Sequence, residues 1–354
     1  MTKRILFIIN PISGTHSKES IPTLIGEVID RDRFEYSIAF TEYGGHAAEM
    51  AVQAVNDGVD IVVAVGGDGT INEVARSLVH TDTALGIIPC GSGNGLARHL
   101  QIPMNTKKAL EIINRCDIQP LDYGIINNLP FFCTCGMGFD AYVSFKFAMS
   151  GKRGPTTYVE NVLKEGLKYK PEVYEIEDET GKNKYKAFLI ACANASQYGN
   201  NAYIAPQASM SDGMMDVIIM EPFNVIEAPQ LSIQLFTKTI DKNSKIKTFK
   251  AKEIHIHRAK EGVIHFDGDP IMTDKDVDVR MVSKGIKMVV NPEAAEFKET
   301  LPQETDSSST LQSIFSELFN DINSVREDLQ HDITKTGRKI QVINKALLRK
   351  LTKG

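Results

Sequence analysis

The pattern of apolar positions changes near residue 118 and divides the chain into two regions. In the first region, short runs rich in apolar and β-branched residues predict strands at residues 4–9, 35–41, 60–65 and 84–89. Segments with apolar residues at helical spacing follow them, at residues 21–29, 47–56, 71–77, from 96 onward and at 107–114. This alternation predicts an N-terminal Rossmann-like α/β nucleotide domain built on a mostly parallel sheet.

After Asp117 the chain consists mostly of short extended runs. The predicted strands cover residues 123–126, 131–135, 173–177, 187–193, 215–220, 252–257, 277–281 and 286–290. Only residues 157–169 and 229–239 have helical spacing in this region. We therefore expect a β-rich second domain, either a sandwich or a rolled sheet.

A polar stretch around Ser307, Ser308 and Ser309 precedes a C-terminal segment with helical periodicity. The predicted division is residues 1–118 for an ATP-binding α/β domain and 119–299 for a β-sandwich domain that takes the substrate. Residues 300–354 form a linker and an amphipathic helical tail. The expected fold class is thus α/β, with a β-rich sandwich domain and a helical tail.

Composition and charge narrow the classes of function. The 354 residues are 42% hydrophobic and 24% charged, as in a water-soluble globular protein, and the net charge is −5. A negative chain offers no general basic surface, so we expect no nucleic-acid partner. Five scattered cysteines without a Cys-x-x-Cys pair favour reduced thiols and a cytoplasmic location. No apolar stretch reaches the length of a transmembrane helix, so we expect association with the inner face of a membrane to be peripheral.

The tail is the one strongly basic segment. Residues 335–354 hold seven Lys or Arg and no acidic residue, and Ile340, Ile343, Leu347 and Leu351 form an apolar stripe. A basic amphipathic helix of this kind binds an anionic membrane surface. The preceding segment has a second stripe with acidic neighbours, which favours packing on the body of the protein or pairing with another copy in a homodimer. The alternative is that the two helices pack on each other and contact no lipid.

Residues 61–74 carry the clearest candidate chemistry. An uncharged apolar run leads into Gly66-Gly67-Asp68-Gly69-Thr70, and Thr70 is expected to cap a helix that begins near Ile71. The glycines allow positive φ angles and close approach of a ligand, and the helix start favours an anion. Asp68 would repel a phosphate unless a cation lay between them, so the stretch predicts a Mg²⁺-nucleotide. An ordinary glycine turn is the alternative, but it has no use for Asp68.

Two further polar turns follow predicted strands of the same domain. Residues 90–95 read Cys-Gly-Ser-Gly-Asn-Gly and precede a predicted helix, and residues 10–14 read Asn-Pro-Ile-Ser-Gly. Ligands of open α/β sheets bind outside the carboxyl ends of the strands, where these turns are expected to lie. Two glycine loops at strand ends of one sheet are a stronger indication of a nucleotide site than either alone.

Seven short motifs in a fixed order resemble one family. They are Asn10-Pro-Ile-Ser-Gly14, Thr41 with Gly45-His46-Ala47, Gly66-Gly-Asp-Gly-Thr-Ile-Asn-Glu73, Gly91-Ser-Gly-Asn94, Gly138-Phe-Asp140, Ser209-Met-Ser-Asp-Gly-Met214 and Asp267-Gly-Asp269. Each motif is weak alone. Their order over residues 4–290 resembles the diacylglycerol kinase and sphingosine kinase family of lipid kinases.

The resemblance implies an α/β nucleotide domain followed by a β-sandwich, and ATP-dependent phosphorylation of a membrane lipid. It implies ATP contacts at Asn10, Ser13, Gly14, Thr41, Gly66, Gly67, Asp68, Gly69, Thr70, Asn72 and Ser92. Asp68 would help to hold catalytic Mg²⁺, and Asp269 would be the general base for a primary hydroxyl. A structural Mg²⁺ would be bound by Asp212 and by the carbonyl groups of Ser209 and Met214.

The sequence departs from the family pattern near the implied structural metal. Gly95 stands where an acidic residue is frequent, and Thr15 stands where a Lys or Arg is frequent. The acceptor lipid also stays open, because Gly91-Ser-Gly-Asn94 resembles the sphingosine kinase branch whereas Gly138-Phe-Asp140-Ala141 resembles the diacylglycerol branch. An NAD kinase-like enzyme and a non-catalytic nucleotide- or lipid-binding protein are the alternatives to a lipid kinase.

Overall fold

The structure is a computed structural model and describes residues 2–14, 18–150, 169–224, 226–294 and 296–297. These residues belong to one unit, residues 1–298, while residues 299–354 form a second unit. The predicted linker and basic tail lie outside the described residues, as does nearly all of the predicted helix at 157–169. The domain boundaries at residues 118 and 299 stay predictions.

The N-terminal region contains the predicted parallel sheet. Strands β1 (Lys3–Ile9), β2 (Phe34–Phe40), β3 (Ile61–Gly66) and β4 (Ala84–Pro89) pair in the order β2-β1-β3-β4, all in parallel. Every residue of β3 and β4 is buried, as expected for strands covered on both faces. The prediction of a Rossmann-like α/β region is therefore confirmed.

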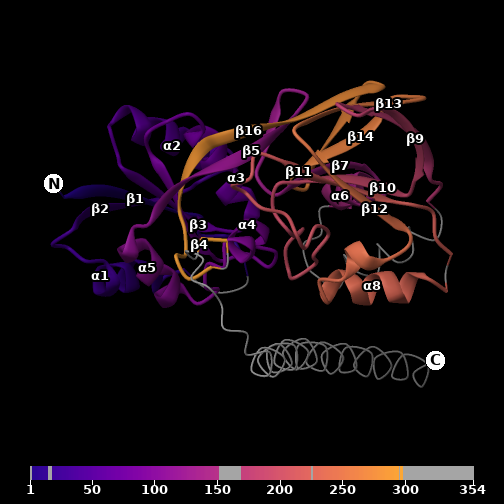
Figure 1. Cartoon of the computed structure of the whole chain (residues 1–354). Helices are drawn as coiled ribbons and strands as arrows, with labels where there is room; N and C mark the ends of the chain where they lie inside the picture. Colours follow the sequence, from indigo (N-terminus) through magenta and orange to yellow (C-terminus); the bar gives the residue numbers. More distant parts are fainter. Residues whose placement is uncertain (1, 15–17, 151–168, 225, 295, 298–354) are drawn as a thin grey trace, which may run out of the picture. The chain divides into compact units, whose positions relative to one another are not determined.

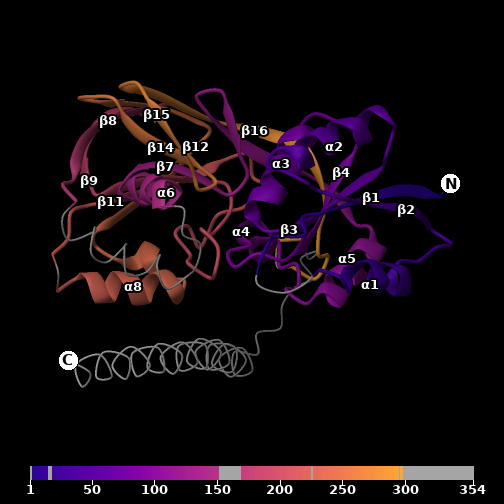
Figure 2. The ribbon, with the colours of Figure 1, turned by 180° about the vertical axis from the view of Figure 1, so that it is seen from behind.

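Helices cover both faces of this parallel sheet. Helices α2 (His46–Asn56) and α3 (Asp68–Leu78) pack together on one face, and α1 (Ile21–Val28) and α5 (Thr106–Arg115) pack on the other, as Figures 1 and 2 show from opposite sides. The short helix α4 (Gly95–His99) follows the second glycine loop. Each strand is thus followed by a helix that buries its apolar face against the sheet.

One long strand joins the two regions. Strand β16 (Asp276–Val289) pairs with β5 (Ile118–Ile126) over most of its length, with β4 at Met288, and with β13 (Glu253–Arg258) at its other end (Figure 1). The sequence predicted two strands here, at 277–281 and 286–290. The structure has one, and its pairing is irregular between Val282 and Ile286. A Cβ atom at Gly285 would lie 2.3 Å from the Tyr123 ring, so this irregular segment accommodates the ring.

The remaining strands form a two-layer sandwich, which confirms the second predicted architecture. One layer extends the first sheet through β13 to β8 (Glu172–Asp178) and β9 (Gly181–Ala187). The other layer has the order β12-β11-β10-β7-β14-β15, with bounds Ile246–Ala251, Met215–Met220, Leu189–Ala193, Thr134–Gly138, Gly262–Phe266 and Asp269–Thr273. A buried core that includes Ile176, Ile256, Met137 and Ile264 fills the space between them.

Helices α6 (Phe139–Ser150) and α8 (Ala228–Phe236) and a short 3₁₀ helix (Ile240–Lys242) follow strands of the second layer, and β6 (Leu129–Phe131) pairs with β5. Among the described residues, no helix is long and apolar enough to cross a membrane.

Candidate active site

Four polar or glycine-containing turns meet at one edge of the parallel sheet. Asn10, Thr41 and Gly66 stand at or just after the carboxyl ends of β1, β2 and β3, and Cys90 follows β4. Hydrogen bonds between neighbouring strand ends hold the turns together, with Asn10 N donating to Val65 O at 3.0 Å and Cys90 N to Gly66 O at 2.8 Å. This is the edge at which open α/β sheets bind ligands.

The first turn is fixed against the start of α3. Asn10 Nδ2 donates to Thr70 Oγ1 at 2.9 Å, and Ser13 Oγ donates to the Asn10 carbonyl at 3.0 Å. Gly14 has a φ of +66°, and a Cβ atom there would lie 1.9 Å from the Cys90 carbonyl oxygen. Of the predicted contact residues, Asn10, Ser13, Gly14 and Thr70 are therefore brought together.

Helix α3 begins at Asp68, three residues before the predicted start. Gly67 is its N-cap residue, and the prediction that Thr70 caps the helix is wrong. Thr70 lies within the first turn, where its hydroxyl accepts from Asn10 instead. Asp68 consequently occupies the first turn of a helix, a position where the macrodipole stabilises a carboxylate.

The glycines of the first loop provide close packing and not unusual backbone angles. Gly66, Gly67 and Gly69 all have negative φ, contrary to the expectation. A Cβ atom at Gly66 would lie 2.7 Å from Thr70, and one at Gly91 would lie 2.6 Å from the Gly67 Cα. The two glycine loops thus touch through backbone atoms. Gly69 differs, because a Cβ atom there would have no protein atom within 4 Å.

The Asp68 carboxylate joins the two glycine loops. Its Oδ2 accepts from Asn94 N at 2.8 Å and its Oδ1 from Gly95 N at 2.7 Å. Asn94 adopts a left-handed conformation with a φ of 52°, and its amide side chain bonds both backbone groups of Gly91. Each carboxylate oxygen can accept a second contact, so Asp68 keeps the capacity to bind a cation. The place where the loops of residues 66–70 and 90–95 meet is called the glycine-loop corner below. Thr41 and Asn72 are buried near it, whereas Ser92 is exposed on the second loop.

Asp267 and Gly268 form the two-residue turn of the β14–β15 hairpin. Their φ angles are 52° and 86°, which is typical of a type I′ turn. The Asp267 side chain is half-buried, and its carboxylate accepts from the N–H groups of Phe132, Cys133 and Thr134 at 2.8, 2.7 and 3.2 Å. Burial raises the pKa of Asp267 to about 6, against these hydrogen bonds and the charge of Arg76, which lower it. Asp267 is thus a structural anchor of the turn.

Asp269 is the exposed carboxylate of the same turn. Its side chain is 57% exposed, and its Oδ2 lies 3.0 Å from Arg76 Nη2 on helix α3. Sequence reasoning missed Arg76, because a single arginine on a helix has no local signal for a contact 193 positions away. The two predicted catalytic carboxylates, Asp68 and Asp269, are therefore linked through one helix.

A buried polar chain lies beneath the hairpin turn. His265 Nε2 lies 3.0 Å from Asp140 Oδ2, which also accepts from the Tyr198 hydroxyl at 3.1 Å. His265 Nδ1 accepts from Gly268 N at 3.4 Å. Because Nδ1 accepts, the Nε2 atom of the neutral ring carries the proton and donates to Asp140. Asp140 of the Gly138-Phe-Asp140 motif thus supports the turn that carries Asp269.

The implied structural metal site lies in the loop of residues 209–214. Glu296 accepts from Ser209 Oγ at 2.6 Å and from Met210 N at 2.7 Å, and its Oε2 lies 3.2 Å from His99 Nε2. Burial alone would raise the pKa of Glu296, but the hydrogen bonds from His99, Ser209 and Met210 lower it to about 2. Glu296, which sequence reasoning also missed, therefore ties this loop to helix α4.

The carboxylate of Asp212 already has a cationic partner. Lys250 Nζ lies 2.5 Å from Asp212 Oδ2 and 3.5 Å from Asp216 Oδ2. Within the described part of the chain, no group of three His, Cys, Asp or Glu side chains is arranged to hold a metal ion. As arranged, the loop fits an ammonium group at Asp212 and not a divalent cation, so we derive no step through a metal there. The assignment of Ser209, Asp212 and Met214 as ligands stays a prediction.

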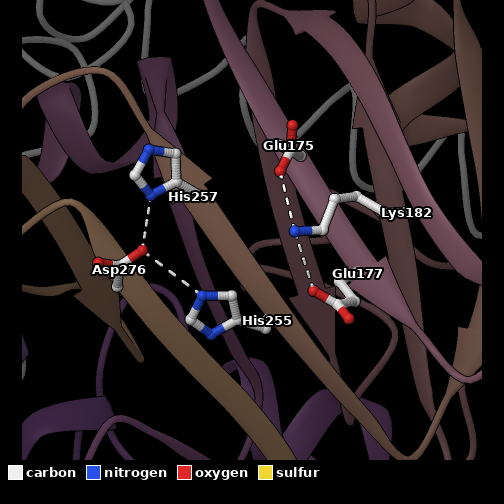
Figure 3. A pocket seen from close by; sticks show the side chains of 6 residues that line it. All are labelled: Glu175, Glu177, Lys182, His255, His257 and Asp276. Carbon is white, nitrogen blue, oxygen red and sulfur yellow. Dashed lines mark hydrogen bonds and ion pairs between the residues drawn. The ribbon is translucent and has the colours of Figure 1, made fainter.

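A second cluster of charges lies in a surface hollow of about 270 Å³ on the sandwich (Figure 3). It is lined by Glu175, Glu177, Lys182, His255, His257 and Asp276, none of which the sequence singled out. Lys182 pairs with both glutamates at 3.1 and 3.2 Å, and Asp276 Oδ1 lies 2.6 Å from His257 Nδ1. The charges of this cluster are thus paired with one another.

Comparison with protein families matches both regions. Residues 4–126 match the diacylglycerol kinase catalytic domain, and residues 134–290 match the YegS C-terminal NAD kinase beta sandwich-like domain. The first match contains Asp68 and both glycine loops, and the second contains the 209–214 loop and Asp269. Together the two matches include the residues of both glycine loops, the 209–214 loop and the hairpin of Asp269, whereas Glu296 lies beyond them.

Similar proteins agree with this assignment. A diacylglycerol kinase from Staphylococcus saprophyticus is 27% identical over 76% of this chain and 90% of its own length. One from Bacillus subtilis is 27% identical over 75% of this chain and 90% of its length. The solved structure of a diacylglycerol kinase from Bacillus anthracis superposes with a TM-score of 0.63 at 21% identity, covering 82% of this chain and 97% of that one. This last likeness shows the fold.

Proposed function

We propose, since this chain belongs to the family of lipid kinases with a diacylglycerol kinase catalytic domain, that it transfers the γ-phosphate of ATP to the primary hydroxyl of a membrane lipid. The observation that carries the proposal is the link between Asp68 and Asp269 through helix α3. One end of the helix meets two glycine loops, as a nucleotide requires. The other end meets an exposed carboxylate on the sandwich.

The glycine-loop corner supports binding of the ATP phosphates. The N-terminus of α3 carries unpaired N–H groups and a positive partial charge, and the open space at Gly69 lets a phosphate approach the backbone. Mg²⁺, which Asp68 would help to hold, supplies charge neutralisation at the phosphates when it is bound. Phosphoryl transfer needs such positioning more than covalent chemistry.

Asp269 is suited to act on the acceptor. Its exposed carboxylate accepts the proton of the lipid hydroxyl while that oxygen forms a bond to the γ-phosphorus. The bond between the γ-phosphorus and the bridging oxygen breaks, and ADP leaves with the electron pair. Arg76 holds one carboxylate oxygen, and the other stays able to accept the proton.

We favour diacylglycerol over a sphingoid base as the acceptor. The Gly138-Phe-Asp140 motif supports this choice, as do similar proteins named diacylglycerol kinase. The substrate lies in a bilayer, so the enzyme would work as a cytoplasmic protein on the inner membrane face. Binding of the basic tail to anionic lipid and formation of a homodimer remain proposals, because both involve residues outside those described.

The test is transfer of labelled γ-phosphate to a panel of acceptors in mixed micelles. We expect labelling of diacylglycerol, weaker labelling of a long-chain sphingoid base and none of NAD. NAD belongs in the panel because the second region matches an NAD kinase-like sandwich. A clear preference for the sphingoid base would show that it, and not diacylglycerol, is the acceptor. Labelling of NAD alone would show that the protein is an NAD kinase. Labelling of no acceptor would favour a binding protein.

A further inference from the structure

Among the contacts described above, the ion pair between Arg76 and Asp269 is the one that directly connects helix α3 with the hairpin of Asp269. Arg76 lies on α3 eight residues after Asp68, which places the two Cα atoms about 12 Å apart along the helix. Its Nη2 lies 3.0 Å from Asp269 Oδ2, and its guanidinium carbon lies 4.7 Å from the centre of the Phe266 ring. Phe266 and Asp269 are the pair that flanks the hairpin turn. Arg76 therefore contacts both strands where the turn begins and ends.

The charge of Arg76 acts on both carboxylates of the turn. It is bonded to Asp269, and it also lowers the pKa of Asp267, which burial raises. The Phe266 ring restricts the guanidinium by a cation–π contact, and the side chain is only 27% exposed. A planar guanidinium held on a ring fixes the orientation of the carboxylate that it binds.

Asp269 needs such support more than a buried carboxylate would. It stands on an exposed hairpin, and Asp267 anchors the backbone of the turn but not the Asp269 side chain. Displacement of a catalytic group by about 1 Å costs up to roughly 10²-fold in rate. Something must therefore set where the Asp269 carboxylate lies relative to the nucleotide.

From this geometry we infer that Arg76 is a positioning residue, which holds the Asp269 carboxylate at a fixed distance from the nucleotide-binding end of α3. The inference rests on the proposed function, because it takes Asp269 as the general base. Arg76 touches neither substrate in this account, and its effect on phosphoryl transfer is exerted through Asp269. Its loss should therefore slow transfer without weakening nucleotide binding.

The first experiment compares Arg76→Met, Arg76→Lys and the parent enzyme in diacylglycerol phosphorylation. We expect Arg76→Met to lower kcat by roughly 10- to 100-fold, with the Kd for ATP and the Tm unchanged. Arg76→Lys keeps the charge but not the planar fork, so its kcat should lie between the two. The matched control is Arg115→Met, which removes the Arg115–Glu293 pair at 2.6 Å on another helix and should leave kcat unchanged.

The second experiment is a double-mutant cycle with Asp269→Asn. If Arg76 acts through Asp269, the Arg76→Met, Asp269→Asn double variant is no slower than Asp269→Asn alone. Independent, multiplying losses would show that Arg76 acts on another group and would overturn the inference. So would a parent rate for Arg76→Met, or a loss explained by a lower Tm in both Arg76 variants. A parent rate for Asp269→Asn would instead refute the assignment of the base itself.

Discussion

The two carboxylates of the site are held in opposite ways. Asp68 accepts two backbone N–H groups from the second glycine loop, in a corner where Gly67 and Gly91 touch through backbone atoms. Asp269 stands 57% exposed on a hairpin and is held by one side chain, Arg76. The position of Asp68 is thus built into the fold, whereas that of Asp269 depends on a pair that a single substitution removes.

Loss of Asp68 is therefore expected to affect both stability and activity, whereas loss of Asp269 is expected to affect activity alone. Asp68 is expected to contribute to stability in addition to its proposed role in the chemistry, because it satisfies the N–H groups of the buried residues Asn94 and Gly95. Asp269 contributes little to stability, because exposed ion pairs add little to the free energy of unfolding. Variants whose stability and activity are measured separately therefore test this contrast between Asp68 and Asp269.

The largest effect is expected for replacement of each carboxylate by its amide. Asp269→Asn should lower kcat by roughly 10²- to 10⁴-fold and leave the Tm unchanged, because the substitution removes only the proposed base. Asp68→Asn should abolish activity and also lower the free energy of unfolding by about 1–3 kcal/mol, since an amide offers one acceptor oxygen to two N–H donors. Kinetics and thermal unfolding of both variants measure this. Equal Tm losses in the two variants would contradict the comparison.

The next effect separates two glycines of the same corner. A Cβ atom at Gly93 would lie 2.7 Å from Asp68 Oδ2, so Gly93→Ala should destabilise the protein by about 1–3 kcal/mol. Gly69→Ala meets no protein atom and should keep or raise the Tm, since alanine favours helix. If a phosphate fills the space beside Gly69, the Gly69→Ala protein should nevertheless bind ATP about tenfold more weakly. This corresponds to a loss of about 1.4 kcal/mol in binding free energy.

Calorimetric titration with ATP, alongside thermal unfolding, tests both glycine variants. Unchanged ATP affinity in Gly69→Ala would show that the open space is not part of the nucleotide site. A Gly93→Ala protein as stable as the parent would show that the loop can move away from Asp68.

A smaller effect is expected at the loop of residues 209–214. Lys250→Met leaves the partly buried Asp216 without its cation and should lower the free energy of unfolding by about 1–3 kcal/mol. Added Mg²⁺ should restore part of this stability. The parent Tm, measured without nucleotide, should change neither with EDTA nor with Mg²⁺. The control is Lys247→Met on the same strand as Lys250, which removes an exposed ion pair with Glu221 and should be nearly neutral. A parent protein that EDTA destabilises would restore the predicted structural metal.

The smallest effect concerns the paired surface charges of Figure 3. A hydrogen bond to Asp278 raises the pKa of His255 above its usual 6.5, with help from the charges of Asp278 and Asp276. Its contribution to stability is therefore complete below pH 6.5 and is lost as pH rises through the raised pKa. His255→Gln should flatten this part of the profile of Tm against pH, and added salt should do the same in the parent. An identical slope in the two proteins would exclude the pair as its source.

The sequence predicted the glycine-loop corner well because its signals are local. Apolar runs, glycines and a helix start stand together within residues 61–74 and again within 84–96. Their neighbourhood in space follows from parallel pairing of β3 and β4. The errors there were also local, since the helix starts at Asp68 and the glycines pack closely at negative φ.

The hairpin region was predicted less completely because its partners are distant in the chain. Strands β9, β12, β14 and β15 were not predicted, since Lys-, Gly- and Pro-containing segments such as residues 262–273 lack clear alternation. The hairpin turn itself has a local signal, because Asp-Gly is typical of the type I′ turn that Asp267 and Gly268 form. Arg76, Lys250 and Glu296 could not be found from spacing, because each acts through a contact that only the tertiary fold creates.

The shared strand β16 has a consequence for how the protein is made. Strand β4 is buried along its whole length, yet its neighbour on one side is β16, which ends at Val289. A ribosome therefore releases the whole parallel sheet long before the strand that covers its edge exists. Until then β4 presents an unpaired, apolar edge of the kind that joins other chains. The edge of β4 therefore stays unpaired, or must be shielded, while some two hundred further residues are synthesised. Pairing between strands so distant in the chain is also slow to form.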